Sequence, residues 1–176
     1  QSSIAVVVGG LLVYAVSFIV DYREIAIVKT WGRAGQPLYG RRPTQAGFHW
    51  KWPLPAQELV RYEGRIFTFD DTADQVGTKD KLNVLVTVFC AWRIADAGQF
   101  LQQAETVENA QNLLRGLVRS TKKNVVGTHD LSEFLNTNPA AMDIRGIERE
   151  ITDKVARDVA AAKYGIEIVT IGIRSF

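Results

Sequence analysis

The sequence predicts an α+β protein in which a membrane anchor precedes a β-rich half and a helix-rich half. Three observations lead to this fold class: an uncharged apolar run near the N-terminus, an alternating apolar pattern that ends near residue 96, and helical periodicity beyond it. With 176 residues, 47% of them hydrophobic, the chain is long enough to bury a real core. We therefore expect an anchor in residues 1–22, a β-rich part in residues 23–96, and a helical part with a closing strand in residues 97–176.

The anchor is predicted from residues 4–20, which carry no charge. As a helix this segment would span roughly 25 Å, slightly less than the ~30 Å hydrocarbon core of a bilayer. A cleaved signal peptide is one alternative, because Ala15-Val16-Ser17 resembles a cleavage site, and a buried core helix is another. The run continues past that site and has no polar stripe, which favours a retained anchor. The expected anchor residues are Ile4, Val8, Leu11, Leu12, Val16, Phe18, Ile19 and Val20, with Tyr22 at the membrane interface.

Short apolar runs separated by turn residues predict the β-rich part. Residues 25–30 form a β-rich run that ends at Trp31-Gly32, and the Gly-, Pro- and Arg-rich residues 32–47 are typical of a long hairpin loop. The longest alternation covers residues 82–94, where every second side chain is apolar from Leu82 to Ile94. This pattern indicates a long, half-buried strand.

Three aromatic residues share one predicted strand face, because Phe48, Trp50 and Trp52 alternate with His49 and Lys51. The simplest interpretation is that this face packs into the core of the β-rich part. The alternative is that the aromatic rings enter a membrane interface, where Trp is favoured and Lys51 can reach lipid phosphates. The candidate membrane-interface residues are therefore Phe48, Trp50, Lys51 and Trp52, in addition to Tyr22.

Helical periodicity begins after residue 96. Thr106 is the expected N-cap of a helix that ends near Gly127. Three basic residues of this helix, Arg115, Arg119 and Lys122, share one face, which we interpret as solvated rather than as a binding patch.

The rest of the helical part contains a short turn, a second long helix and a strand. Asp130 and Glu133 resemble a capping box. The second helix is expected to begin at Asn138-Pro139, since Pro is tolerated in a first helical turn, and to end near residue 164. Residues 166–173 change the phase of their apolar alternation at Val169, which predicts a β-bulge or a strand covered on both faces.

Charge and cysteine content argue against several functions. The 21 basic residues nearly balance 19 acidic ones, so no strong field favours a nucleic-acid partner. Cys90 is the only cysteine, which excludes an intramolecular disulfide framework, and its place in the alternating strand predicts a buried, inert thiol. We expect no nucleic-acid partner and no cofactor.

No motif predicts a catalytic or metal site. His49 and His129 lack sequence-near partners at metal-ligand spacing, and neither a nucleophile elbow nor a phosphate-binding loop is present. Four aspartates crowd the segment before the long strand: Asp70, Asp71, Asp74 and Asp80. Turn formation explains them better than acid–base chemistry or cation binding. The enzyme hypothesis that is left is a membrane-tethered periplasmic enzyme whose site combines Asp70, Asp74 and His49.

Several segments, taken in chain order, resemble the SPFH (Band 7, prohibitin/stomatin) family and its bacterial HflC branch. They are residues 24–32 (EIAIVKTWG), 47–53 (GFHWKWP), 65–70 (RIFTFD), 74–80 (DQVGTKD), 83–94 and 164–168 (YGIEI). The resemblance implies one transmembrane helix, a two-part α+β SPFH domain with a β-rich and a helix-rich half, and a long coiled-coil helix that would follow residue 176. Residues 120–141 depart from the HflC pattern, because this segment is shorter and lacks the longer insertion of that branch.

The resemblance also implies a function. Members of the family assemble into membrane-bound rings or cages, and the HflC type pairs with HflK and regulates the membrane AAA protease FtsH. We therefore expect a non-enzymatic scaffold that organises membrane microdomains, spans the bacterial inner membrane once and faces the periplasm. Its expected partners are membrane lipids, further copies of itself, an HflK-like paralogue and an FtsH-type protease. A stomatin-like regulator of another membrane protein is the alternative from within the same family.

Overall fold

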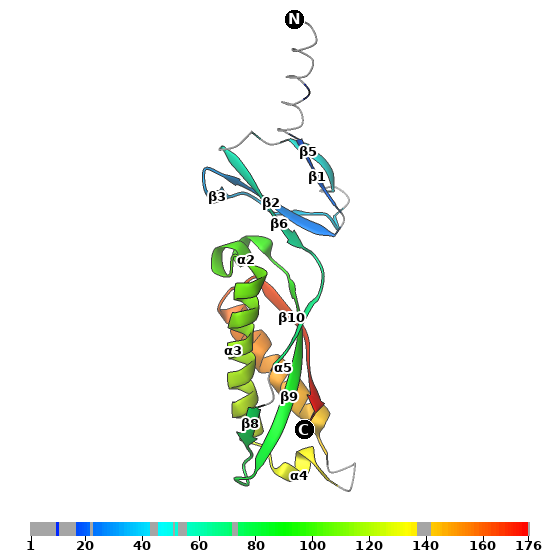
Figure 1. The fold of residues 1–176 in the computed structure, drawn as a ribbon, viewed down its shortest axis with the longest axis vertical. Helices are drawn as coiled ribbons and strands as arrows, with labels where there is room; N and C mark the ends of the chain where they lie inside the picture. The colour runs from blue at the N-terminus through cyan, green and yellow to red at the C-terminus, as the bar shows by residue number, and fades with distance from the viewer. Residues whose placement is uncertain are drawn as a thin grey trace, which may run out of the picture. The chain divides into compact units, whose positions relative to one another are not determined.

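The computed structural model describes residues 10, 17–21, 23–42, 46–50, 52, 56–71, 74–136 and 142–175. The chain divides into two compact units, unit 1 (residues 1–65) and unit 2 (residues 66–176), which are drawn in Figure 1. This division lies earlier than the expected boundary at residue 96, because the long strand, residues 83–94, pairs with the closing strand, residues 166–175, within unit 2.

Unit 1 contains two small antiparallel sheets. In one, β1 (Ser17–Val20) pairs with β5 (Gly47–Trp50). In the other, β2 (Glu24–Thr30) pairs with β3 (Arg33–Ala34), β4 (Leu38–Tyr39) and β6 (Gln57–Glu63). A small core joins them, in which Phe18, Val20 and Ala26 are buried and Val28, Leu38 and Leu59 pack against them.

Strand β1 corrects the predicted end of the anchor. Phe18 and Val20 are buried in the core of unit 1, and Ile19 between them is exposed, as expected for a strand with one covered face. The prediction that Phe18, Ile19 and Val20 belong to a transmembrane helix is therefore wrong. The other anchor residues, Ile4, Val8, Leu11, Leu12 and Val16, lie outside the described residues, as does Tyr22. Within the ranges given above, no helix is long and apolar enough to span a bilayer.

Unit 2 is built around β9 (Asn83–Ile94), which pairs with β10 (Ile166–Ser175) and, over successive stretches, with β8 (Asp74–Gly77) and β7 (Phe67–Asp70). The alternation predicted for the long strand is confirmed from Val84 onward, since Val84, Val86, Val88, Cys90, Trp92 and Ile94 are all buried. Leu82 is the exception, because it precedes the strand and stays half-exposed. The helices α2 (Ala97–Gln103), α3 (Val107–Val126), α4 (Leu131–Phe134) and α5 (Ile144–Ala161) complete the unit (Figure 1).

The helix ends follow the predicted capping signals in two of three cases. Thr106 Oγ1 accepts a hydrogen bond from Asn109 N at 3.2 Å, and the capping box of Asp130 and Glu133 opens α4. Helix α5 begins later than predicted: Asp143 caps it, whereas Asn138-Pro139 lies outside the described residues. The predicted irregularity of the last strand is confirmed, since the β10–β9 register shifts between Ile168 and Thr170.

Candidate functional site

Three of the four tryptophans lie exposed in unit 1. Their exposed fractions are 76% for Trp31, 65% for Trp50 and 72% for Trp52. Ile19 and Phe48, at 64% and 55%, are exposed as well. Burial of such large apolar side chains is the normal outcome of folding, so their exposure is an observation that needs an explanation.

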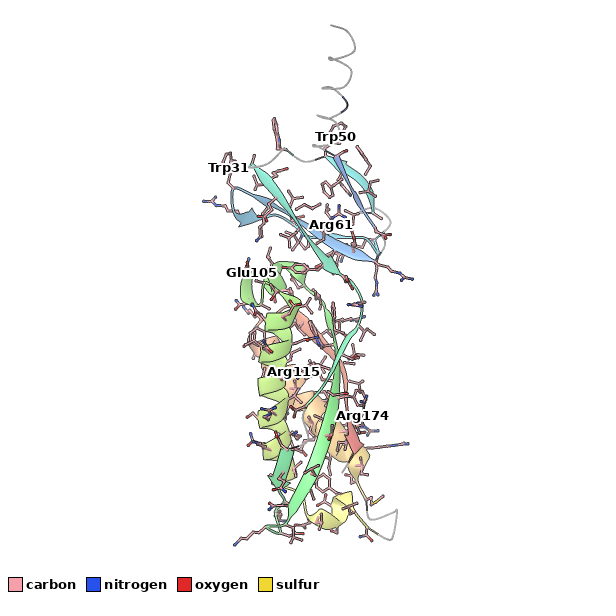
Figure 2. All side chains as sticks on the ribbon, in the orientation of Figure 1. Trp31, Trp50, Arg61, Glu105, Arg115 and Arg174 are labelled. Atoms are coloured by element: carbon pink, nitrogen blue, oxygen red, sulfur yellow. The ribbon has the colours of Figure 1, made fainter. Side chains whose placement is uncertain are left out.

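Hydrogen bonds bring the exposed tryptophans to one end of unit 1. The backbone N–H of Trp31 donates to Ala56 O at 3.0 Å, and that of Trp52 donates to Gln57 Oε1 at 2.7 Å. Gln57 Nε2 in turn donates to Thr30 Oγ1 at 3.0 Å, so the start of β6 connects both tryptophan-bearing segments. Figure 2 shows Trp31 and Trp50 at this same end of the unit. We call Ile19, Trp31, Phe48, Trp50 and Trp52 the tryptophan end.

Strands β1 and β5 position the remaining apolar side chains of the tryptophan end. Ile19 lies opposite Phe48 in the antiparallel ladder, and the rings of Phe48 and Trp50 make an edge-on contact with centroids 5.5 Å apart. On the other face of β5, His49 stacks on Phe18 at 5.6 Å. The shared face is thus confirmed for Phe48 and Trp50, whereas Trp52 follows the end of β5. The interpretation that these aromatic rings pack into the core is wrong, because they are exposed and His49 faces the core instead. Lys51 lies outside the described residues.

Trp31 was not among the candidate residues, and its backbone makes it notable. Trp31 and Gly32 form a two-residue connection between β2 and β3 with φ angles of 50° and 77°, as in a type I′ turn. Glycine adopts positive φ freely, whereas a bulky side chain there costs about 1–3 kcal/mol. A tight hairpin between two β-rich runs could have been predicted from Trp31-Gly32. Trp31 is thus both largely exposed and in a backbone conformation that is unfavourable for its side chain.

The two units also differ in charge. Residues 1–65 contain eight Lys and Arg against four Asp and Glu, whereas residues 66–176 contain thirteen against fifteen. Unit 1 is therefore net positive and unit 2 net negative. Exposed tryptophans on a positively charged unit suit a lipid–water interface, where Trp is favoured and anionic headgroups attract basic residues.

The basic face predicted for α3 is exposed at its two arginines but not at its lysine. Lys122 is fully buried, and its Nζ lies 2.5 Å from Oδ2 of Asp71, which is itself only 1% exposed. Lys122 Nζ also donates to Val86 O at 3.2 Å. Arg119 lies beside the pair, with contacts to Asp71 at 3.3 Å and to Asp74 at 3.1 Å. The prediction is wrong at Lys122 because the connection between β7 and β8 places a buried carboxylate against that helix face.

The crowded aspartates are structural in the described part of the chain. Asp70 pairs with Arg174 at 2.6 Å, and Asp80 Oδ2 accepts a hydrogen bond from Leu131 N at 3.0 Å. The hypothetical enzyme site has little support from this arrangement, since Asp70 and Asp74 are both paired with arginines. No group of three metal-ligating side chains gathers among the described residues. Burial raises the pKa of the Cys90 thiol to about 12, which leaves it protonated and unreactive.

Comparisons with known proteins place these features in a family. Residues 18–176 match the SPFH domain / Band 7 family. Protein HflC of Vibrio cholerae is 25% identical over 161 residues, which is 89% of this chain and 48% of that protein. The modulator of FtsH protease HflC of Escherichia coli K12 is 24% identical over 179 residues, 92% of this chain and 52% of that protein. Band 7 protein CG42540 of Drosophila melanogaster is 31% identical over 115 residues, 65% of this chain and 21% of that protein. The chain thus spans about half the length of the HflC proteins.

Proposed function

Because the chain belongs to the SPFH domain / Band 7 family, we propose that it is a non-enzymatic, membrane-associated scaffold whose tryptophan end contacts the bilayer. The observation that carries the membrane contact is the gathering of three exposed tryptophans at one end of unit 1. Tryptophan has an apolar ring system and a polar N–H, so the boundary between headgroups and acyl chains satisfies both.

The expected strength of this contact follows from the area involved. Transfer of one large apolar side chain out of water contributes about 1.5–3 kcal/mol when it is fully buried. Five exposed apolar side chains at the tryptophan end would supply several kcal/mol even if each were buried only in part. Together with the anchor expected in the N-terminal apolar run, this contact would hold unit 1 against the membrane surface.

The relatives suggest what such a scaffold does. The matched Escherichia coli protein is named a modulator of FtsH protease. We infer that this chain likewise modulates an FtsH-type membrane protease, in rings or cages formed with copies of itself and an HflK-like paralogue. In this proposal the protein crosses the bacterial inner membrane once, faces the periplasm and organises the surrounding membrane into microdomains.

Fluorescence quenching tests the membrane contact in the intact chain. Single-tryptophan variants, with the other three tryptophans changed to Phe, are reconstituted in vesicles that contain lipids brominated on the acyl chain. We expect strong quenching of Trp31, Trp50 and Trp52. Trp92 is the internal control, because it is buried in unit 2 between Phe67 and Phe100 and should be unaffected. Equal quenching of Trp50 and Trp92 would exclude the proposed contact.

Protease modulation needs a separate assay. An FtsH-type protease is reconstituted with a membrane-protein substrate, and the degradation rate is measured with and without the chain extended to the length of its HflC relatives. We expect the chain to change this rate and to copurify with the protease. An unchanged rate together with the absence of copurification would refute modulation while leaving the membrane contact intact.

A further inference from the structure

His129 connects three elements at one end of unit 2. It lies in the connection between α3 and α4, where its side chain is about four-fifths buried. Its Nδ1 is 2.6 Å from Glu133 Oε2 in α4, and its Nε2 is 3.0 Å from Glu150 Oε2 in α5. One imidazole ring therefore bridges two carboxylates that are distant in the sequence.

The protonation state of the ring decides whether both contacts exist. An ionised carboxylate only accepts hydrogen bonds, whereas a neutral imidazole has a single N–H to donate. Two donations to two carboxylates therefore require the imidazolium form. If the ring loses a proton, one nitrogen lone pair faces a carboxylate oxygen, and that contact becomes repulsive.

We propose that His129 is a pH-sensitive clamp, which fastens the α3–α4 connection to α5 when protonated and releases one of its two carboxylates when neutral. This device is independent of the proposed membrane contact, since it involves unit 2 alone. Helix α4 is the element whose stability it controls. Glu133 also accepts a hydrogen bond from Asp130 N at 3.1 Å, so the same side chain serves both the clamp and the N-terminus of α4.

The charged groups around the ring come from each element packed against it. In α5, Lys154 Nζ lies 2.7 Å from Glu150 Oε1 and helps to hold this carboxylate ionised. In the turn between β8 and β9, Lys79 N donates to His129 O at 3.0 Å, and Lys79 Nζ lies 3.8 Å from Asp130. A hydrogen bond between the carboxyl groups of Asp80 and Asp130 raises the pKa of Asp130 and lowers that of Asp80. The ring thus faces two carboxylates directly, with Lys79 and Lys154 one contact further away.

The direction of the pKa shifts agrees with this geometry. Partial burial of His129 opposes the charged form, but the hydrogen bonds and charges of Glu150 and Glu133 outweigh it and raise the pKa above the ordinary 6.5. The hydrogen bond from His129 lowers the pKa of Glu133, and those from Lys154 and His129 lower the pKa of Glu150.

The pH window follows from these directions. The contribution of His129 is complete below its ordinary pKa of 6.5 and is lost as the pH rises through the higher pKa of the folded state. The contribution of the glutamates is present above their ordinary 4.5 and is lost as the pH falls through their lowered pKa values. The clamp is therefore complete between these two values and opens on the alkaline side, within the range in which histidine senses physiological pH.

The test measures hydrogen exchange and proton NMR on the whole chain at about pH 6 and about pH 8. After correction for intrinsic exchange, we expect the amides of residues 127–136 to open more often at the higher pH. The opening constant should rise about tenfold for every pH unit by which the folded-state pKa of His129 exceeds its ordinary value. His129→Gln should abolish this dependence, and His49→Gln, which removes the only other histidine of the sequence, should leave it unchanged.

NMR titration of the histidine rings provides a second, direct test. We expect the His129 ring to titrate above pH 6.5, and Glu150→Gln to move the midpoint downward. A midpoint at or below this ordinary value, or a wild-type pH dependence that persists in His129→Gln, would overturn the proposal.

Discussion

Trp50 and Trp92 show how differently the two units treat the same type of residue. Trp92 is completely buried, with its ring stacked against Phe67 at 4.9 Å and facing Phe100 at 6.3 Å. Trp50 lies in a short strand with most of its surface in solvent. Both units expose some large apolar side chains, but the exposed tryptophans all belong to unit 1, whereas the tryptophan of unit 2 lies in its core. The membrane contact proposed above would account for the exposed tryptophans of unit 1.

Charged residues differ between the units in the opposite sense, since unit 2 buries an ion pair and unit 1 keeps its ion pairs exposed. Unit 2 takes a lysine and an aspartate out of water and pairs them, at a desolvation cost that only good geometry offsets. The ion pairs in the described residues of unit 1, such as Arg61 with Glu24, stay on the surface, where such pairs contribute about 0–1 kcal/mol. The architecture of unit 2 therefore depends on buried electrostatics to a degree that unit 1 does not.

The largest expected effect comes from breaking the buried pair. Asp71→Asn leaves the buried charge of Lys122 with only the more distant carboxylate of Asp74, 4.0 Å away, and should lower the free energy of unfolding by about 3–5 kcal/mol. Asp70→Asn is the matched control, because its exposed partner Arg174 should make the loss less than about 1 kcal/mol. Urea denaturation followed by circular dichroism measures both.

The double variant Asp71→Leu with Lys122→Met distinguishes charge from packing. Since it removes both buried charges, it should recover most of the stability that Asp71→Asn loses. If Asp71→Asn and Asp70→Asn lowered the free energy of unfolding by equally small amounts, the buried pair would stabilise unit 2 no more than a surface pair does.

A smaller loss is expected at Gly172, on the face of the sheet opposite the buried side chains of β9. A Cβ atom at this position would overlap the ring of Phe89, so Gly172→Ala should destabilise unit 2 by about 1–3 kcal/mol. Gly116 in α3 has open space around it, and Gly116→Ala should instead stabilise the helix by about 0.5–1 kcal/mol. Opposite shifts of the thermal midpoint would confirm that packing decides the sign; shifts of the same sign would count against it.

The smallest change of stability is expected at Trp31, where we expect a substitution to stabilise the chain rather than to destabilise it. Asn tolerates positive φ, so Trp31→Asn should raise the free energy of unfolding by about 1 kcal/mol or less. The same variant should reduce vesicle binding, because an interfacial side chain is lost. A core residue would behave in the opposite way. If Trp31→Asn destabilised the chain and left vesicle binding unchanged, the assignment of the tryptophan end to contact would fail.

Local patterns in the sequence were sufficient for most elements of unit 2. The alternation that ends at Ile94, the N-cap at Thr106 and the phase change at Val169 each depend on neighbours a few residues away. Prediction failed where two patterns overlap. Residues 17–20 continue an apolar run that reads as a helix, yet they pair with β5, which lies some thirty residues later in the chain.

The sequence by itself determined the α+β fold class and the faces of the long strand, because these follow from backbone periodicity. Its motifs also determined the family resemblance. Which individual side chains are buried and which are exposed depended on the tertiary structure. It buried Lys122 by bringing Asp71, 51 positions away, to its ammonium group. It left the tryptophan end uncovered, because no other described element of unit 1 packs over that face. Burial depends on what folds back against a residue, and a one-dimensional pattern does not contain that information.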